Sequence, residues 1–240
     1  MTFASHIIRQ PRPFDASAGA GISDRFHDLD AVGLLSAVAA CSPYLMGLML
    51  REEAFLRDGL TMQPDAALDA QFAALEGLTT EVLGSGLRQI KRRVALWTAL
   101  CDLGGVWPLE TVTGALTRLA DRAVHLALIT QVGEEIRRGK LPGATPDDAA
   151  TAGGMVALAM GKMGAGELNY SSDIDLICLF DEARYRGAEQ EARASFIKVA
   201  RRMTAILSDA TDGYVFRTDL RLRPDAAVTP VCLSMAAAES

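Results

Sequence analysis

Two hydrophobic periods divide the chain. From about residue 24 to 140, apolar side chains recur every three or four positions, as at Leu96 and Leu100, which is the period of amphipathic helices. Further along, residues 155–160 and 174–180 form short, nearly continuous apolar runs, typical of buried strands. The pattern therefore predicts an α+β protein in which a helical region precedes a small mixed sheet.

Two segments follow neither period. Residues 1–23 are rich in Pro, Gly and Ser, and residues 141–154 contain two prolines and three glycines. A composition rich in these residues is typical of loops and linkers. We therefore expect a loose N-terminal arm (1–23), a helical region (24–140), a linker (141–154) and a second domain (155–240).

One segment has the length of a membrane span. No residue from Ala31 to Leu50 is charged, and about 20 apolar residues suffice to cross a bilayer. Ser42 followed by Pro43, however, is typical of a helix N-cap with proline at the first helical position. We expect two short buried helices here. Since the start of the chain also lacks a secretory signal, we expect a cytoplasmic protein without a membrane segment.

Composition and charge narrow the functional classes. The chain is 50% hydrophobic and 22% charged, as in globular proteins. Its net charge of −6 argues against nucleic acid as a partner, because such binding requires a basic surface. The four scattered cysteines form no C-x-x-C pair, so we expect buried, reduced thiols. The basic run at 91–93 is interpreted as a solvated helix face, with a regulatory contact as the minor alternative.

The candidate chemistry lies between the two apolar runs. Asp173 and Asp175 begin the second run and, in a strand, would project from the same side. Two carboxylates at this separation suit a hard divalent cation, and Mg²⁺ prefers carboxylate, water and phosphate oxygens. We expect these aspartates to be catalytic metal ligands.

A Gly-rich turn precedes these aspartates. Gly161 and Gly164 would let backbone N–H groups approach a phosphate, and Lys162 would add positive charge. The turn is neither a Walker A loop, since Met163 follows the lysine, nor a dinucleotide fingerprint, since the glycines are spaced G-x-x-G-x-G. The sequence predicts a phosphate site beside the metal site.

A third carboxylate is found near the end of the chain. If residues 213–224 form a strand, alternation places Phe216, Leu220 and Leu222 on one face. The other face carries Arg217, Asp219, Arg221 and Arg223. An aspartate among arginines suits a metal ligand surrounded by phosphate-binding groups. Each motif also has an interpretation without a catalytic role. The aspartate pair could belong to a turn, and the arginine-rich strand could be a charged, solvated edge of the sheet.

The motif over residues 161–175 as a whole is more specific than the aspartate pair or the glycines taken singly. The residues Gly161-Lys162-Met163-Gly164, Glu167-Leu168-Asn169 and Ser172-Asp173-Ile174-Asp175 resemble the signature of glutamine synthetase adenylyltransferase/adenylyl-removing enzymes. Asp219, Arg221, Arg223 and Pro224 are similar to the same family's third-carboxylate strand. The resemblance implies a polymerase-β-like nucleotidyltransferase core, with Asp173, Asp175 and Asp219 as ligands of Mg²⁺. It also adds Ser172 to the nucleotide-binding set, alongside Gly161, Lys162, Gly164, Arg221 and Arg223.

The resemblance further implies a reaction and partners. Such enzymes add AMP to a tyrosine of glutamine synthetase or remove it by phosphorolysis, giving ADP. The position of the motif matches the removing domain, so the expected partners are glutamine synthetase, phosphate, ADP or ATP, and a PII-type signalling protein. The alternatives are adenylyl transfer from ATP and a non-catalytic binding module. Since the family has a second domain and further helices, we expect the chain to be a fragment truncated at its C-terminus.

Overall fold

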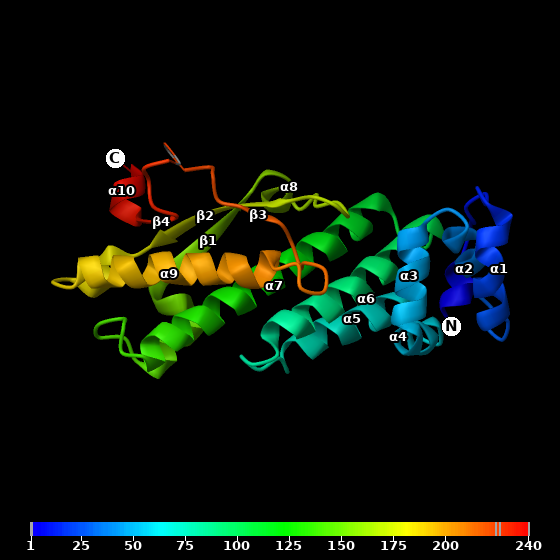
Figure 1. The fold of residues 1–240 in the computed structure, drawn as a ribbon, viewed down its shortest axis with the longest axis horizontal. Helices are drawn as coiled ribbons and strands as arrows, with labels where there is room; N and C mark the ends of the chain where they lie inside the picture. The colour runs from blue at the N-terminus through cyan, green and yellow to red at the C-terminus, as the bar shows by residue number, and fades with distance from the viewer. Residues whose placement is uncertain (1, 224, 226, 240) are drawn as a thin grey trace. The chain divides into compact units, whose positions relative to one another are not determined.

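A computed structural model describes residues 2–223, 225 and 227–239 (Figure 1). Pro224, part of the family motif, lies outside them. The chain divides into two compact units, the first comprising residues up to Leu78 with Gln89–Leu119 and the second Thr79–Arg88 with the rest of the chain from Ala120. Unit 1 draws on η1 Phe3–His6, α1 Ala16–Arg25, α2 Val32–Ala39, α3 Pro43–Arg51, α4 Glu53–Leu60, α5 Pro64–Leu75 and parts of α6 Leu83–Leu103 and α7 Leu109–Arg137.

Trp97 is the centre of the core of unit 1. Its indole is fully buried and donates a hydrogen bond from Nε1 to the carbonyl of Pro64 at 2.9 Å. The rings of Phe3 and Phe55 lie 4.8 and 6.0 Å from it. A Cβ at Gly59 would come within 3.0 Å of the indole, so the close approach of α4 depends on that glycine. Aromatic contacts of this kind stabilise a core beyond their area of burial.

The expected loose arm over residues 1–23 is wrong in this structure. Phe3 is completely buried, and helix α1 begins after an N-cap at Asp15, whose side chain accepts a hydrogen bond from the backbone of Ser17. One of the small residues that indicated a loop, Gly19, instead allows helices α1 and α2 to approach closely, because a Cβ there would lie 2.6 Å from the carbonyl of Ser36.

The prediction of two short helices within Ala31–Leu50 is confirmed, but only α2 is largely buried, since Tyr44 and Leu50 of α3 are 58% and 44% exposed. Ser42 accepts a hydrogen bond from the backbone of Leu45, and Pro43 occupies the first position of α3. Across the described part of the chain, no helix combines the length and the apolarity that a bilayer span requires.

Two other sequence interpretations are corrected in unit 1. Arg92 and Arg93 do not form a solvated face, because both pair with the carboxylate of Glu52, whose side chain is only 3% exposed, at 2.8 and 2.9 Å. Cys41 is exposed rather than buried, since it lies in the break between α2 and α3, where its thiol donates to the carbonyl of Arg12. The other three cysteines are buried as expected.

The sheet belongs to unit 2. Strands β1 Met155–Met160 and β2 Ile174–Phe180 are antiparallel and pair Met155 with Phe180 and Met160 with Asp175. Two shorter strands, β3 Thr218–Asp219 and β4 Cys232–Ser234, run parallel to β2. The expected mixed sheet is confirmed, and β4 was not predicted.

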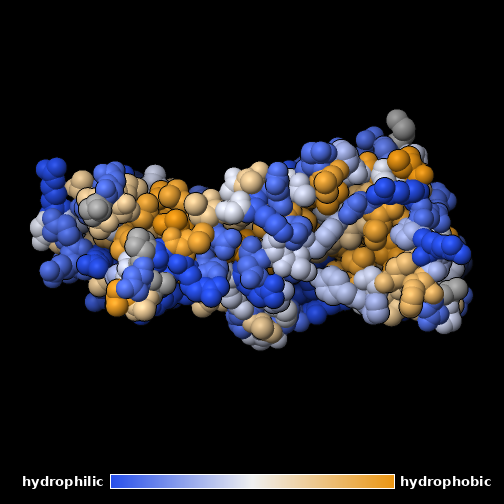
Figure 2. Space-filling view, turned by 90° about the horizontal axis from the view of Figure 1, so that it is seen from above, coloured by the Kyte–Doolittle hydropathy of each residue, from blue (hydrophilic) through white to orange (hydrophobic). Residues whose placement is uncertain are grey.

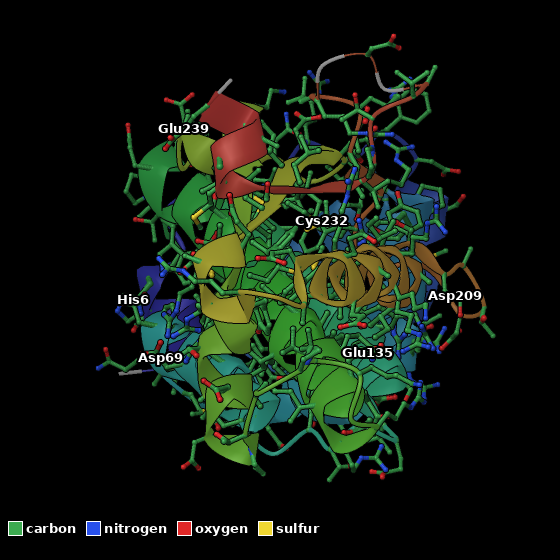
Figure 3. The ribbon with its side chains drawn as sticks, turned by 90° about the vertical axis from the view of Figure 1, so that its left-hand side faces the viewer. His6, Asp69, Glu135, Asp209, Cys232 and Glu239 are labelled. Carbon is green, nitrogen blue, oxygen red and sulfur yellow. The ribbon has the colours of Figure 1, made fainter. Side chains whose placement is uncertain are left out.

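Helix α9 Glu189–Ser208 covers one face of the sheet (Figure 1). Phe196 stacks on Phe180 with ring centroids 5.0 Å apart. The last part of α7 packs on α9, where Arg202 bonds the buried Glu135 at 2.6 Å; Figure 3 shows Glu135 on the side of α9 opposite to Cys232 of β4. These contacts explain why the compact unit takes in residues 120–140, which the sequence pattern had assigned to the helical region. Unit 2 also contains η2 Pro146–Gly154, α8 Gly161–Gly164, η3 Glu182–Tyr185 and α10 Met235–Glu239.

The segment 141–154 is a structured connection. Leu141 and Gly153 are buried, and the hydroxyl of Tyr185 donates to the carbonyl of Gly153 at 2.6 Å. Thr145 and Asp148 form a capping box at the start of η2, which satisfies backbone donors at a helix end. The connection therefore fixes the point at which β1 begins.

Candidate functional site

Three aspartates meet at one end of the sheet. Asp175 lies in β2, and its partner across the parallel pair is Asp219 of β3, so both side chains stand on the same face. Asp173 precedes β2 by one residue and is exposed, whereas Ile174 is fully buried. The predicted alternation is therefore confirmed, and the topology brings together two carboxylates 44 residues apart in sequence.

The Gly-rich turn packs directly against these carboxylates. Gly161 has a φ of +55°, and a Cβ there would lie 2.8 Å from Oδ2 of Asp175. A Cβ at Gly164 would lie 2.4 Å from the carbonyl of Ala159, so this glycine lets α8 fold back onto β1. Both glycines are thus required by close approach. Lys162, between them on α8, is exposed.

Two of the three carboxylates, those of Asp173 and Asp219, form ion pairs with arginine side chains. Arg217 bonds Asp173 through Nε and the carbonyl of Ser171 through Nη2. Arg221 forms a fork on Asp219, with Nε at 2.9 Å from Oδ2, and its own backbone N–H donates to the same carboxylate at 2.7 Å. The hydrogen bonds from Arg221 hold the pKa of Asp219 below its usual value. Asp219 is therefore ionised at neutral pH, as a metal ligand must be.

The same hydrogen bond shortens the predicted third strand. Because Asp219 accepts from the backbone of Arg221, the chain turns after two strand residues instead of continuing through 213–224. Leu222 is consequently 50% exposed, although alternation had placed it on the same face as Phe216. Phe216 itself is buried.

Two expected phosphate-binding residues have other partners in this structure. Arg223 donates to the carbonyls of Leu220 and Thr229, and so it holds the loop after β3. The hydroxyl of Ser172 bonds the side chain of Asn169 within the turn before β2. Arg217, which sequence alternation placed on the aspartate face without assigning it to the site, is in contact with Asp173 instead.

The donor set fits a hard divalent cation. Three carboxylates and a nearby exposed lysine suit Mg²⁺ with phosphate oxygens. In the arrangement described for residues 2–223, 225 and 227–239, no three Asp, Glu, His or Cys side chains are grouped to hold a metal. Asp173 and Asp219 are paired with Arg217 and Arg221 instead.

A cavity of about 330 Å³ lies elsewhere in unit 2. Residues of α7, η2, β1 and α8 line it, including Asp121, His125 and Met155. Met155 belongs to the covered face of the sheet, since it pairs with Phe180. The carboxylates stand on the opposite face, so this cavity is not part of their site.

The sheet and its carboxylate edge define a nucleotidyltransferase-type α+β protein, as expected. Comparison with known proteins agrees: the family model described as glutamate-ammonia ligase adenylyltransferase matches residues 32–240. The chain belongs to this family.

Curated relatives are also named as adenylyltransferases. The chain is 43% identical over 234 residues to a bifunctional glutamine synthetase adenylyltransferase/adenylyl-removing enzyme of Rhodopseudomonas palustris, covering 94% of this chain and 23% of the relative. A relative of the same name from Caulobacter vibrioides is 44% identical over 214 residues, or 87% of this chain and 22% of its own length. The chain thus spans less than a quarter of the length of these two relatives.

Proposed function

We propose that the chain carries a nucleotidyltransferase centre that removes AMP from an adenylylated tyrosine of glutamine synthetase by phosphorolysis. The observation that carries the proposal is the register of β2 and β3, which sets Asp175 beside Asp219 with Asp173 two residues away. The names of the curated relatives, which include adenylyl removal, support the choice of substrate.

In this reaction an oxygen of inorganic phosphate attacks the phosphorus of the adenylyl group. The bond from that phosphorus to the tyrosine oxygen breaks, the proton of the phosphate passes to the tyrosine, and ADP and free tyrosine are formed. Asp173, Asp175 and Asp219 would hold Mg²⁺, which neutralises charge on the attacking and leaving oxygens. Once released from Asp219, Arg221 would bind a phosphate oxygen, together with Lys162.

The test is phosphate-dependent release of ADP from adenylylated glutamine synthetase in the presence of Mg²⁺. We expect release by the 240-residue chain and its loss in Asp173→Asn, while Asp147→Asn, which changes an exposed aspartate of η2, retains it. Unchanged release in Asp173→Asn would overturn the proposal. Pyrophosphate formation from ATP and unmodified glutamine synthetase would instead select adenylyl transfer, the second candidate, which the same relatives' names support.

A third outcome concerns binding without catalysis. If the chain binds glutamine synthetase or a PII-type protein and forms neither ADP nor pyrophosphate, it acts as a binding module. Calorimetry with Mg²⁺ and ADP separates this case, because nucleotide binding that Asp175→Ala abolishes contradicts a purely non-catalytic role.

A further inference from the structure

The face of the sheet that carries the aspartates is apolar along the rest of its length. Cross-strand partners share a face, and Met160 pairs with Asp175, Leu158 with Ile177, and Val156 with Leu179. Leu233 of β4 continues the row beside Leu179. We call this surface the open apolar face; its residues are Val156, Leu158, Met160, Ile177, Leu179 and Leu233.

The long helix α9 packs on the other face, while among the described residues the short helices α8 and α10 also contact β2 and leave the side chains of Leu158 and Met160 exposed. Leu158 is 45% exposed and Met160 38% exposed, and the other four side chains are half-buried. Figure 2, which looks onto the sheet from above, shows hydrophobic side chains gathered over the strand region. An apolar surface beside a few polar groups is the usual lining of a small-molecule site.

We propose that the open apolar face is the platform for the purine base of the adenylyl group. This inference rests on the proposed function. Met160 and Asp175 are direct cross-strand partners, so the apolar surface begins where the phosphate-binding carboxylates end. A ligand with phosphates at Asp175 and an uncharged, flat end matches this order of polarity.

The size of the face favours a base over a protein partner. Five strand residues span about 13 Å at a rise of about 3.3 Å each, and adjacent strands lie about 4.8 Å apart. A stable protein interface buries about 800 Å² on each partner, several times the area available. A base stacked on Leu158 and Ile177, with the sulfur of Met160 at its edge, fills it.

The order of residues along β1 also indicates which part of the nucleotide each side chain would contact. Leu158 lies two residues from Met160, about 7 Å along β1, which is the separation between a nucleotide's phosphate and its base in an extended nucleotide. Met160 would therefore contact the ribose side of the base and Leu158 its outer ring. In β1 and β2, no charged residue stands on this face between Asp175 and Leu179, so the base displaces only weakly held water.

The experiment compares two probes by calorimetry, Mg·ADP and Mg·pyrophosphate, which lacks a base. We expect the double variant Leu158→Ala, Met160→Ala to weaken ADP binding about tenfold and to leave pyrophosphate binding unchanged. Leu109→Ala, which changes a 68% exposed leucine of α7, is the matched control and should affect neither probe. Both substituted side chains are partly exposed, so the variant should keep its circular dichroism spectrum and melting temperature.

Several results would overturn the platform. One is equal weakening of both probes, which would mean that the variant distorts the carboxylates. Others are unchanged ADP binding, no ADP binding by the unaltered chain, or a change confined to the KM for adenylylated glutamine synthetase, which would assign the face to the polypeptide. Asp175→Ala separates the two proposals: if it leaves both probes bound, the proposed catalytic centre fails, whereas loss of both probes in Asp175→Ala together with unchanged ADP binding in the double variant keeps the centre and overturns the platform.

Discussion

At the scale of single residues, Gly161 affects both the backbone conformation of the turn and the position of the Asp175 carboxylate. An alanine there would have to adopt a φ of +55° and place its Cβ 2.8 Å from the carboxylate of Asp175. We expect Gly161→Ala to lower the free energy of unfolding by about 1–2 kcal/mol, from left-handed strain and the clash. It should also weaken Mn²⁺ binding at least tenfold by displacing Asp175. Urea denaturation and calorimetry measure the two effects.

Gly187 supplies a matched control. Its φ is +84°, but a Cβ at this position would meet no other atom within 4 Å, so Gly187→Ala introduces the strain without the collision. We expect a similar loss of stability and normal Mn²⁺ binding. Equal metal binding in the two variants would show that contact with Asp175 is not what requires glycine at position 161.

Arg217 pairs with Asp173 and would compete with a cation bound there. Both side chains are about half exposed, and an exposed ion pair contributes about 0.2–1 kcal/mol. Removing the guanidinium should therefore strengthen Mn²⁺ binding by no more than about fivefold. We expect this gain in Arg217→Gln by calorimetry at low salt, and a smaller gain at about 0.5 M NaCl, where the ion pair is screened. Weaker binding in the variant would contradict a competing role.

Sequence reasoning placed the candidate carboxylates on one side but did not predict their arginine partners. Asp173 and Asp175 could be placed on one side because strand alternation is local. Arg217 was placed on the aspartate face, but its contact with Asp173 spans 44 residues and depends on how the loop before β2 folds. No periodicity carries that information. The role of Gly161 in making room for Asp175 was likewise hidden, since the pattern indicated only a turn.

At the scale of elements, Glu52 links α4 to α6. Its carboxylate is 3% exposed and accepts from Arg92 and Arg93, which are 15% and 27% exposed. Removing one partner of such a buried cluster leaves charge without compensation, which typically costs about 3–5 kcal/mol. Allowing for the partial exposure of the arginines, we expect Glu52→Ala to lower the free energy of unfolding by about 2–4 kcal/mol, measured by urea denaturation.

An exposed ion pair in the same unit is the control. Asp69 and Arg118 lie 3.0 Å apart with 62% and 51% of their side chains exposed. Asp69→Asn should change the free energy of unfolding by less than about 1 kcal/mol. If the two substitutions cost the same, burial of Glu52 does not decide the stability of this contact.

Elements with strong local signals were predictable, and short ones were not. The cap at Ser42 and the apolar strands β1 and β2 depend on neighbouring residues, so their positions could be predicted correctly. Strand β4 has three residues and forms only by pairing with β2. Helix α1 was misjudged because Gly19 serves packing against α2 rather than a loop, a distinction that tertiary structure alone makes.

At the scale of the whole molecule, buried thiols couple stability to pH. Burial raises the pKa of Cys178 to about 12 and that of Cys232 further, whereas an unfolded thiol ionises near about 8.5. The folded state therefore binds the thiol protons more tightly. Their contribution is complete below about pH 8.5 and is lost as the pH rises toward the folded values.

The expected loss of stability follows from this difference between the folded and unfolded pKa values of the thiols. Between about pH 7.5 and 9.5 each of the two thiols should lower the free energy of unfolding by about 1.4 kcal/mol. The variant Cys178→Ala, Cys232→Ala should be less stable at the lower pH, because it leaves cavities, but should lose about 3 kcal/mol less over this pH range. Urea denaturation at both pH values measures the difference. Cys41→Ala, which removes an exposed thiol, serves as the control, and an identical pH dependence in the double variant and the unaltered chain would contradict coupling through the two buried thiols.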